Sequence, residues 1–148
     1  CINKYYLIDP WKKLDDWNKP YNVENETFNR IYDEVCNKLN IYKDKTVFLR
    51  GTTDEVINNI PNNSIDIIYI DADHTAKGIV IDLIMSFPKV KNGGILGGDD
   101  YVKNIFQHDI KKYDPTMVKP VFDGFIIAYK NKISEIMTNE NQFLLKKI

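Results

Sequence analysis

Residues 64–70 are the segment that most constrains the fold of this chain. Their sequence, Ser-Ile-Asp-Ile-Ile-Tyr-Ile, is almost continuously apolar. Such a run is typical of a central strand in a parallel sheet, which is buried on both faces. It leads directly into Asp71-Ala72-Asp73-His74, and a carboxylate that ends a buried strand is costly unless it has a partner. We therefore expect an α/β fold with functional side chains at the ends of its strands.

Shorter patterns along the chain predict the remaining elements of this fold. Apolar or β-branched runs predict strands at residues 4–8, 46–49, 95–98, 117–121, 125–129 and 143–147. Helical spacing or capping signals predict helices at residues 26–39, 54–60, 79–87 and 103–113, the first two with Asn25 and Thr53 as N-caps. Strands that alternate with helices, followed by a strand-rich tail, predict a single domain over residues 1–148. Its sheet is expected to be mostly parallel and Rossmann-like, with an antiparallel C-terminal edge.

Composition excludes several classes of protein. With 43% hydrophobic and 28% charged residues, the 148-residue chain has an ordinary globular composition. The net charge is -1 and only two of the 20 basic residues are arginines, so we expect no nucleic-acid partner. There is no apolar run of membrane-spanning length and no signal peptide, and two cysteines cannot form a disulfide framework. We expect no membrane association and a cytoplasmic location.

Polar residues at predicted strand ends are the candidate functional groups. Ligands of open α/β sheets bind beyond the carboxyl ends of the strands. Three predicted strands end in carboxylates and a fourth ends in small polar residues: Asp9, Asp71 with Asp73, Asp99 with Asp100, and Gly51-Thr52-Thr53. If the strands are parallel, these groups converge on one edge of the sheet.

Three motifs together give the chain a family resemblance. They are Ile-Asp-Pro-Trp at residues 8–11, Asp-Ala-Asp-His at residues 71–74, and Asp-Asp-Tyr at residues 99–101. With their flanking residues they resemble a class I S-adenosylmethionine (SAM)-dependent methyltransferase. Within that class they are most similar to the metal-dependent sugar O-methyltransferases of macrolide biosynthesis. The resemblance covers approximately residues 4–130.

The resemblance implies a role for each candidate residue. Asp9 matches the acidic residue that binds the SAM ribose hydroxyls, and Gly51 and Thr52 would lie near the adenine. Asp71, Asp99 and Asp100 match the positions that hold Mg²⁺, a cation that prefers oxygen ligands. His74 matches the proposed general base; a histidine ordinarily titrates with a pKa of about 6.5, which suits removal of a hydroxyl proton. Asp71 is expected to serve in catalysis and SAM binding as well as metal binding.

The chain also departs from the family pattern. The first strand of the family fold and its glycine-rich loop, which holds the methionine part of SAM, would lie upstream of residue 1. We therefore expect an N-terminally incomplete methyltransferase-like domain that binds SAM poorly or not at all. The family places that first strand centrally, so its loss would leave two apolar strand edges open, a condition that also favours self-association.

Competing interpretations follow from the same residues. The first is a SAM- and Mg²⁺-dependent enzyme that methylates a small hydroxylated acceptor, such as a sugar or glycan precursor. The second is a non-catalytic methyltransferase-like structural or interaction module. A nucleotide-binding oxidoreductase ranks last, because no Gly-x-Gly-x-x-Gly stands between a strand and a helix.

Individual residues also have ordinary structural explanations. Asp9 could belong to a turn before Pro10, and His74 could be a polar residue at a helix start. Asp73 is expected to be the N-cap of the following helix. The pair Asp99 and Asp100 could be an exposed acidic loop.

Overall fold

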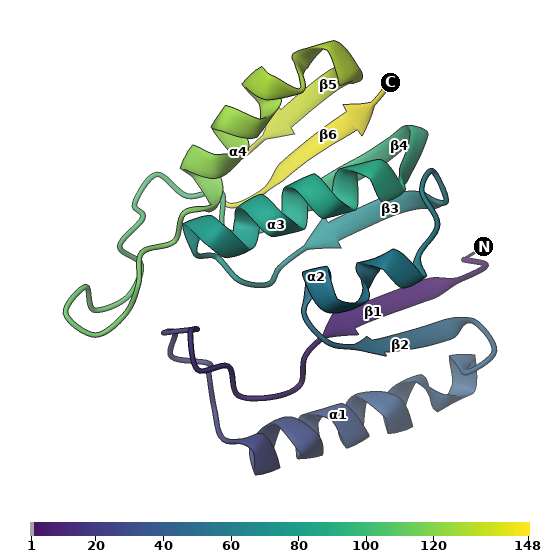
Figure 1. Cartoon of the computed structure of the whole chain (residues 1–148), viewed down its shortest axis with the longest axis vertical. Helices are drawn as coiled ribbons and strands as arrows, with labels where there is room; N and C mark the ends of the chain where they lie inside the picture. The colour runs from purple at the N-terminus through teal and green to yellow at the C-terminus, as the bar shows by residue number, and fades with distance from the viewer. Residues whose placement is uncertain (1) are drawn as a thin grey trace. The chain divides into compact units, whose positions relative to one another are not determined.

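The computed structural model describes residues 2–148, so Cys1 lies outside the described part (Figure 1). The chain forms two compact units, residues 1–57 and residues 58–148, and each is described here by itself. The α/β class predicted from the sequence is confirmed. None of the helices described for residues 2–148 has the length and apolar character that a membrane span needs.

The first unit is a two-stranded parallel sheet with helical segments. Its elements are β1 (Tyr5–Asp9), α1 (Asn25–Leu39), a 3-10 turn (Asn40–Tyr42), β2 (Thr46–Arg50), α2 (Thr53–Val56) and the start of a second 3-10 turn (Ile57–Asn59). The strands pair in register from Tyr5 beside Thr46 to Asp9 beside Arg50. Helix α1 packs on β2 through aromatic rings, since Tyr32 lies edge-on to Phe48 with 5.9 Å between ring centroids.

The second unit is a four-stranded mixed sheet. Its elements are β3 (Ile65–Ile70), α3 (Ala76–Ser86), a 3-10 turn (Phe87–Lys89), β4 (Val90–Gly98), α4 (Val118–Ala128), a further 3-10 turn (Lys130–Lys132), β5 (Ile133–Thr138) and β6 (Phe143–Lys147). The strand order is β3-β4-β6-β5. Strands β3 and β4 are parallel, whereas β6 runs antiparallel to both β4 and β5. The antiparallel C-terminal edge is thus confirmed.

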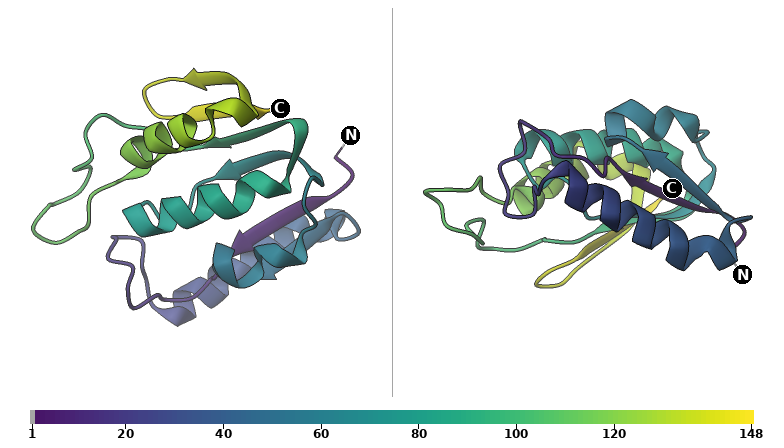
Figure 2. Two further views of the ribbon diagram at one scale, coloured as in Figure 1. Left: turned by 45° about the horizontal axis from the view of Figure 1, so that its top comes forward. Right: turned by 90° about the horizontal axis from the view of Figure 1, so that it is seen from below.

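One face of this four-stranded sheet carries the core of the second unit. Helices α3 and α4 lie over that face (Figures 1 and 2). Leu83 from α3 and Phe122 from α4 are fully buried together with Leu96, Phe143 and Val90 of the sheet. Within the sheet, the ring of Phe143 on β6 packs over Gly98 of β4: a Cβ on Gly98 would lie 2.6 Å from that ring and 2.7 Å from the Ile70 carbonyl oxygen of β3.

The sheet differs from the expected single, mostly parallel one. The described strands form two separate sheets, and the larger one has one parallel pairing, β3 with β4, and two antiparallel pairings, β4 with β6 and β5 with β6. Strands β1 and β3 each have one hydrogen-bonded neighbour among residues 2–148, so both are edge strands.

The predicted strands at residues 117–121 and 125–129 are wrong. Both segments belong to α4, whose apolar residues Val118, Val121, Phe122 and Phe125 recur at helical spacing. Short apolar runs fit a strand or a buried helix equally well, and only the sheet beneath α4 decides between them. The sequence interpretation also missed strand β5.

The predicted helix at residues 103–113 is wrong as well. The chain between β4 and α4 is irregular. Side chains there bind the nearby backbone: Asn104 Oδ1 accepts from the Phe106 N–H at 3.1 Å, and Asp109 Oδ1 accepts from the Lys111 N–H at 3.0 Å. Such local bonds compete with helical ones. The N-cap residues of three helices also differ from those predicted. The N-cap of α1 is Glu24 and not Asn25, that of α2 is Thr52 and not Thr53, and that of α3 is Thr75 and not Asp73.

Candidate active site

In the first unit, Asp9 lies at the carboxyl end of β1 next to the end of β2. Its carbonyl oxygen accepts from the Gly51 N–H at 3.1 Å, so the structure brings Asp9, Gly51 and Thr52 together as predicted. The Asp9 carboxylate accepts from the Trp11 N–H at 2.6 Å, through Oδ1. Trp11 has a φ of 41°, a left-handed conformation that is rare for a tryptophan. This tight turn leaves Oδ2 of Asp9 available to a ligand.

The environment of Asp9 disfavours its charge. Desolvation by neighbouring atoms raises the pKa of the Asp9 carboxyl above its ordinary value of 3.8, although the bond from Trp11 and the charge of Arg50 act in the opposite direction. The residue is nonetheless exposed at the end of β1, so its carboxylate can accept hydrogen bonds from ligand hydroxyls. A binding role for Asp9 is consistent with this arrangement.

Arg50 organises the loop that follows Asp9. Its Nη2 donates to the Trp11 carbonyl oxygen at 2.9 Å and to Asn29 Oδ1 at 2.6 Å, and its guanidinium lies 4.9 Å from the centre of the Tyr32 ring. It thereby ties the loop to α1. The sequence interpretation gave Arg50 no role, although an arginine at the end of a strand beside a predicted ligand site was a usable signal.

Gly51 and Thr52 have clear local roles. The Thr52 N–H donates to Glu55 Oε2 at 2.8 Å and its hydroxyl donates to Asp54 Oδ1 at 2.6 Å, so Thr52 begins helix α2. A Cβ on Gly51 would lie 2.5 Å from Val56 Cγ1, so the turn into α2 needs glycine. Their predicted position near an adenine stays a prediction.

In the second unit, His74 lies between two carboxylates. Its Nδ1 is 2.7 Å from Asp100 Oδ2, and its Nε2 is 3.5 Å from Asp71 Oδ1. The His74 side chain is 15% exposed, whereas that of Asp71 is 61% exposed. The structure therefore brings together the candidate residues that follow β3 and β4.

The backbone holds this cluster in place. The Asp99 N–H donates to the Ile70 carbonyl oxygen at 3.0 Å, which joins the ends of β3 and β4, and the Met117 N–H donates to the His74 carbonyl oxygen at 2.7 Å. Asp100 has a φ of 57°, a conformation that aspartate tolerates better than most residues. That conformation places the Asp100 carboxylate against the imidazole.

The geometry assigns different tasks to the two nitrogens of His74. A hydrogen bond from Nδ1–H to the Asp100 carboxylate fixes the neutral ring as the tautomer whose Nε2 carries a lone pair. Nε2 is buried and has no hydrogen-bond partner among residues 2–148. In this tautomer Nε2 can accept a proton, and the Asp71 carboxylate, 3.5 Å away, would stabilise the positive ring that results.

Asp73 has a structural task in this cluster. Its carboxylate accepts from the Thr75 N–H at 2.9 Å and from the Thr75 hydroxyl at 3.0 Å. Thr75 in turn accepts from the Gly78 N–H at 3.1 Å and begins α3. Thr75 is thus the N-cap of α3 in place of the predicted Asp73, and Asp73 supports the start of the helix by binding Thr75.

A network that the sequence interpretation did not identify anchors the loop after β4. The Tyr101 hydroxyl donates to Asp123 Oδ1 at 2.9 Å, and Lys119 Nζ donates to both Tyr101 Oη at 2.9 Å and Asp123 Oδ2 at 2.6 Å. Lys119 and Asp123 are one turn apart on α4, but nothing in the sequence links them to Tyr101. The network fixes the residue next to Asp100.

The three predicted metal ligands do not form a metal cluster in the described structure. No group of three or more His, Cys, Asp or Glu side chains within residues 2–148 is arranged to hold a metal ion. Asp71 and Asp100 instead face opposite nitrogens of His74. Their carboxylate oxygens suit Mg²⁺ by chemistry, but their arrangement here suits a histidine.

Comparison with models of known protein families identifies the family of this chain. The family model described as a methyltransferase domain matches residues 2–101. The chain belongs to the methyltransferase domain family. Family membership implies SAM as the methyl donor. Comparison with curated proteins found no match.

Solved structures show that this methyltransferase domain shares its fold with larger proteins. The O-methyltransferase NovP matches with a TM-score of 0.66 and 16% identity over 97% of this chain and 60% of its own. A Corynebacterium glutamicum protein matches with a TM-score of 0.63 and 13% identity over the same shares, 97% and 60%. MycE of the mycinamycin biosynthetic pathway, in complex with Mg and SAH, matches with a TM-score of 0.53 and 13% identity over 96% and 44%. The chain thus spans about 60% or less of these proteins.

Proposed function

We propose that this methyltransferase domain takes part in SAM-dependent O-methylation of a small hydroxylated acceptor, such as a sugar. The observation that carries the proposal is the His74 and Asp100 pair, 2.7 Å apart, at the carboxyl ends of β3 and β4. An oriented imidazole with an unpartnered Nε2 is the group that a hydroxyl acceptor requires. Transfer to oxygen is supported by NovP, an O-methyltransferase of similar fold.

Each residue has a task in the proposed reaction. Bound SAM supplies a methyl group on a positively charged sulfur. His74 Nε2 removes the acceptor's hydroxyl proton as the oxygen forms its bond to the methyl carbon, and the electron pair of the broken carbon–sulfur bond stays on sulfur. Asp100 holds the imidazole in place, and Asp71 stabilises its positive charge. Asp9 would accept hydrogen bonds from the SAM ribose hydroxyls through its free oxygen.

Magnesium is a separate part of the proposal. It is supported by the oxygen donors of Asp71, Asp99 and Asp100 and by the Mg in the MycE complex. Because the described side chains form no cluster of three ligands, we derive the proton transfer without a metal. Titration of the chain with Mg²⁺, followed by the backbone amide signals of residues 71 and 99–100, tests this part directly.

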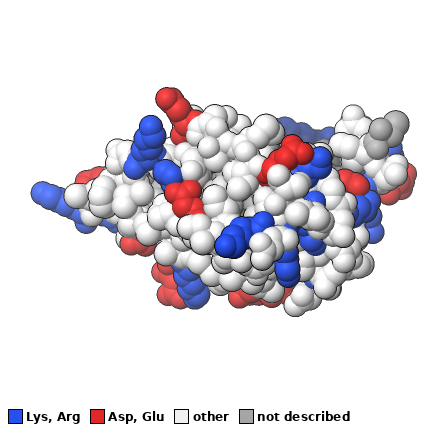
Figure 3. All heavy atoms as spheres, turned by 90° about the horizontal axis from the view of Figure 1, so that it is seen from above, with Lys and Arg blue, Asp and Glu red and all other residues white. Residues whose placement is uncertain are grey.

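We propose a small-molecule acceptor as the only class of partner that the site needs. Both acidic and basic side chains are visible in Figure 3, in keeping with the 20 basic and 21 acidic residues of the sequence. A cytoplasmic location and self-association through an open strand edge stay predictions.

The experiment combines calorimetric titration of SAM with an assay for methyl transfer to a panel of sugars. We expect weak SAM binding that Asp9→Ala weakens further, and a transfer rate that His74→Gln lowers by about 10²–10⁴-fold with little change in SAM affinity. Replacing His108 by Gln is the matched control and should change neither value. A folded chain that binds no SAM would instead favour the non-catalytic module.

A further inference from the structure

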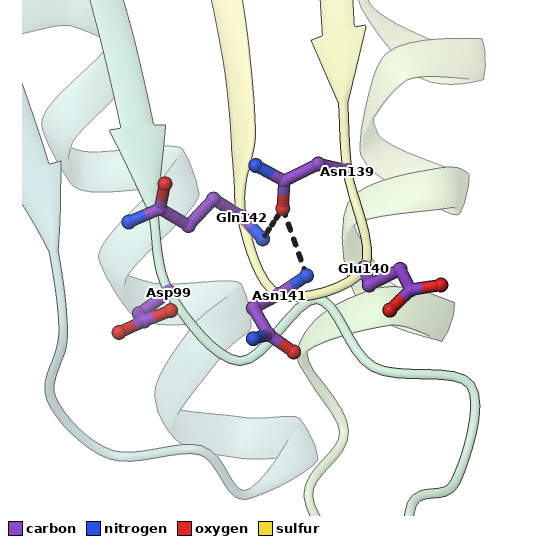
Figure 4. Close-up of a pocket in the computed structure, with 5 residues that line it drawn as sticks. All are labelled: Asp99, Asn139, Glu140, Asn141 and Gln142. Atoms are coloured by element: carbon purple, nitrogen blue, oxygen red, sulfur yellow. Dashed lines mark hydrogen bonds between the residues drawn. The ribbon is translucent and has the colours of Figure 1, made fainter.

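The second unit contains a hollow of about 490 Å³ lined by residues that follow β4 and β5. Its walls are Asp99, at the end of β4, and the turn between β5 and β6, residues 139–142 (Figure 4). We call these four residues the β5–β6 turn. Every lining side chain ends in a carboxylate or an amide: Asp99, Asn139, Glu140, Asn141 and Gln142.

The β5–β6 turn is held in a defined conformation. Asn139 Oδ1 accepts from the N–H groups of Asn141 at 2.8 Å and Gln142 at 2.7 Å, as the dashed lines in Figure 4 show. The Asn139 N–H also donates to the Gln142 carbonyl oxygen at 3.0 Å. The side-chain oxygen of Asn139 is therefore occupied within the turn, and these bonds hold the backbone of Asn141 and Gln142 in place.

The turn is also tied to the strands that carry the candidate base and its partners. The Tyr101 N–H donates to the Asn141 carbonyl oxygen at 2.9 Å, and Gln142 Nε2 donates to the Tyr69 hydroxyl at 2.7 Å. Asp99 is bonded to the next residue through Oδ1, which accepts from the Asp100 N–H at 3.0 Å. The hollow thus begins one residue away from the carboxylate that orients His74.

The side chains left to a ligand define its chemistry. The Asn141 amide and the Glu140 carboxylate have no hydrogen-bond partner within residues 2–148, and both residues are exposed. An amide both donates and accepts, and a carboxylate accepts from two vicinal hydroxyls, so together they match a ring that carries several hydroxyl groups. No Lys or Arg lines the hollow, which disfavours a phosphorylated ligand, and no aromatic ring lines it, which disfavours a flat phenol.

We propose that Asp99 and the β5–β6 turn form an acceptor subsite that binds a neutral, hydroxyl-rich ring such as a sugar. The inference rests on the proposed function for its catalytic meaning, because Asp99 directly precedes Asp100, whose carboxylate contacts His74. Asn141 is its main specificity-determining residue, since its amide alone combines free donors and a free acceptor.

The test follows the backbone amide signals of the whole chain by NMR while neutral methyl glycosides of gluco, galacto and rhamno configuration are added. Catechol and glucose 6-phosphate are the contrasting probes. We expect at least one glycoside to shift the signals of the β5–β6 turn and Tyr101 saturably, with a millimolar Kd. Asn141→Ala should raise that Kd by about five- to tenfold. Asn131→Ala, an exposed asparagine at the other end of β5, should leave it unchanged.

Three results would overturn the subsite: no glycoside shifts the turn, Asn141→Ala binds with an unchanged Kd, or catechol or the phosphate binds there more tightly. SAM calorimetry on the same sample separates this inference from the proposed function. SAM binding and methyl transfer without shifts in the turn would leave the function standing and remove the subsite. Glycoside shifts in the turn without SAM binding would support the subsite and contradict the proposed methyl transfer.

Discussion

The two units of the chain differ in what stabilises them. Residues 58–148 bury a contiguous apolar core in which Leu83, Phe122 and Phe143 are fully inaccessible. Within residues 2–57, only Trp11 and Ile57 are buried apolar residues, and α1 has no buried residue. Their contacts are mainly aromatic edges and the hydrogen bonds of Arg50.

This difference separates the two halves of the proposed chemistry. The acid–base pair of His74 and Asp100 lies on the unit with a dense core, where packing can hold a catalytic geometry. The carboxylate proposed for SAM, Asp9, lies on a two-stranded sheet, an arrangement that is marginally stable by itself. We therefore expect ligand binding to affect the stability of residues 1–57 more than that of residues 58–148.

The largest expected effect comes from truncating one phenylalanine in each unit. Phe122→Ala should lower the free energy of unfolding of residues 58–148 by about 3–5 kcal/mol, because a fully buried ring leaves a cavity. Phe28 is only half-buried on α1, so Phe28→Ala should cost less than about 2 kcal/mol. Urea unfolding followed by circular dichroism measures both. Equal losses would contradict the contrast between the units.

The sequence predicted the elements whose patterns are local. The apolar run at residues 65–70 correctly predicts the strand β3, and α1 has both helical spacing and length. The expectation that this strand is central and buried on both faces is wrong for the described structure, because β3 is an edge strand in which Ile67 is 66% and Tyr69 51% exposed. The prediction from sequence failed at α4, because the apolar residues at 118–128 fit a strand or a helix until their position over the sheet is known. It also failed at residues 103–113, where side-chain bonds to the backbone outweigh helical spacing.

The candidate site was predicted in part for the same reason. Asp71, His74 and Asp100 follow strand ends, and the parallel pairing of β3 and β4 brings them together. Their arrangement around His74 could not be predicted, because it depends on the left-handed conformation of Asp100. Arg50 and the Lys119 and Asp123 network escaped notice because their partners are distant in sequence.

A smaller effect distinguishes two adjacent lysines of β6. Lys147 Nζ donates to the carbonyl oxygens of Val90 at 2.7 Å and Phe87 at 3.2 Å, groups that lie at the edge of the core. Lys147→Met would leave these acceptors unpaired and should lower the free energy of unfolding by about 1–3 kcal/mol. Lys146 pairs with the exposed Glu135 at 3.1 Å, so Lys146→Met should cost less than about 0.5 kcal/mol. Similar urea midpoints for the two variants would show that Lys147 does not support the core.

The smallest effect concerns the charge of Asp9 and the stability of the first unit. Because desolvation raises the pKa of Asp9 in the folded chain above 3.8, the folded state binds a proton more readily than the unfolded state. Stability must then fall as the pH rises from 3.8 through the higher folded pKa, and the ionised carboxylate opposes folding at neutral pH. Asp9→Asn keeps an oxygen for the Trp11 N–H but removes this charge. It should therefore make the variant more stable than the parent at neutral pH, with the difference shrinking towards about pH 4.

Hydrogen exchange of the backbone amides in β1 and β2, at neutral pH and at about pH 4, measures the difference in stability between Asp9→Asn and the parent chain. Asp33→Asn, which replaces an exposed acid on α1, is the matched control and should change stability by no more than about 0.5 kcal/mol at either pH. The SAM affinity of Asp9→Asn shows whether the Asp9 charge, which lowers stability, serves ligand binding. Greater stability together with weaker SAM binding is the signature of a carboxylate kept for its ligand. Greater stability with unchanged SAM binding would reduce Asp9 to the turn residue that precedes Pro10.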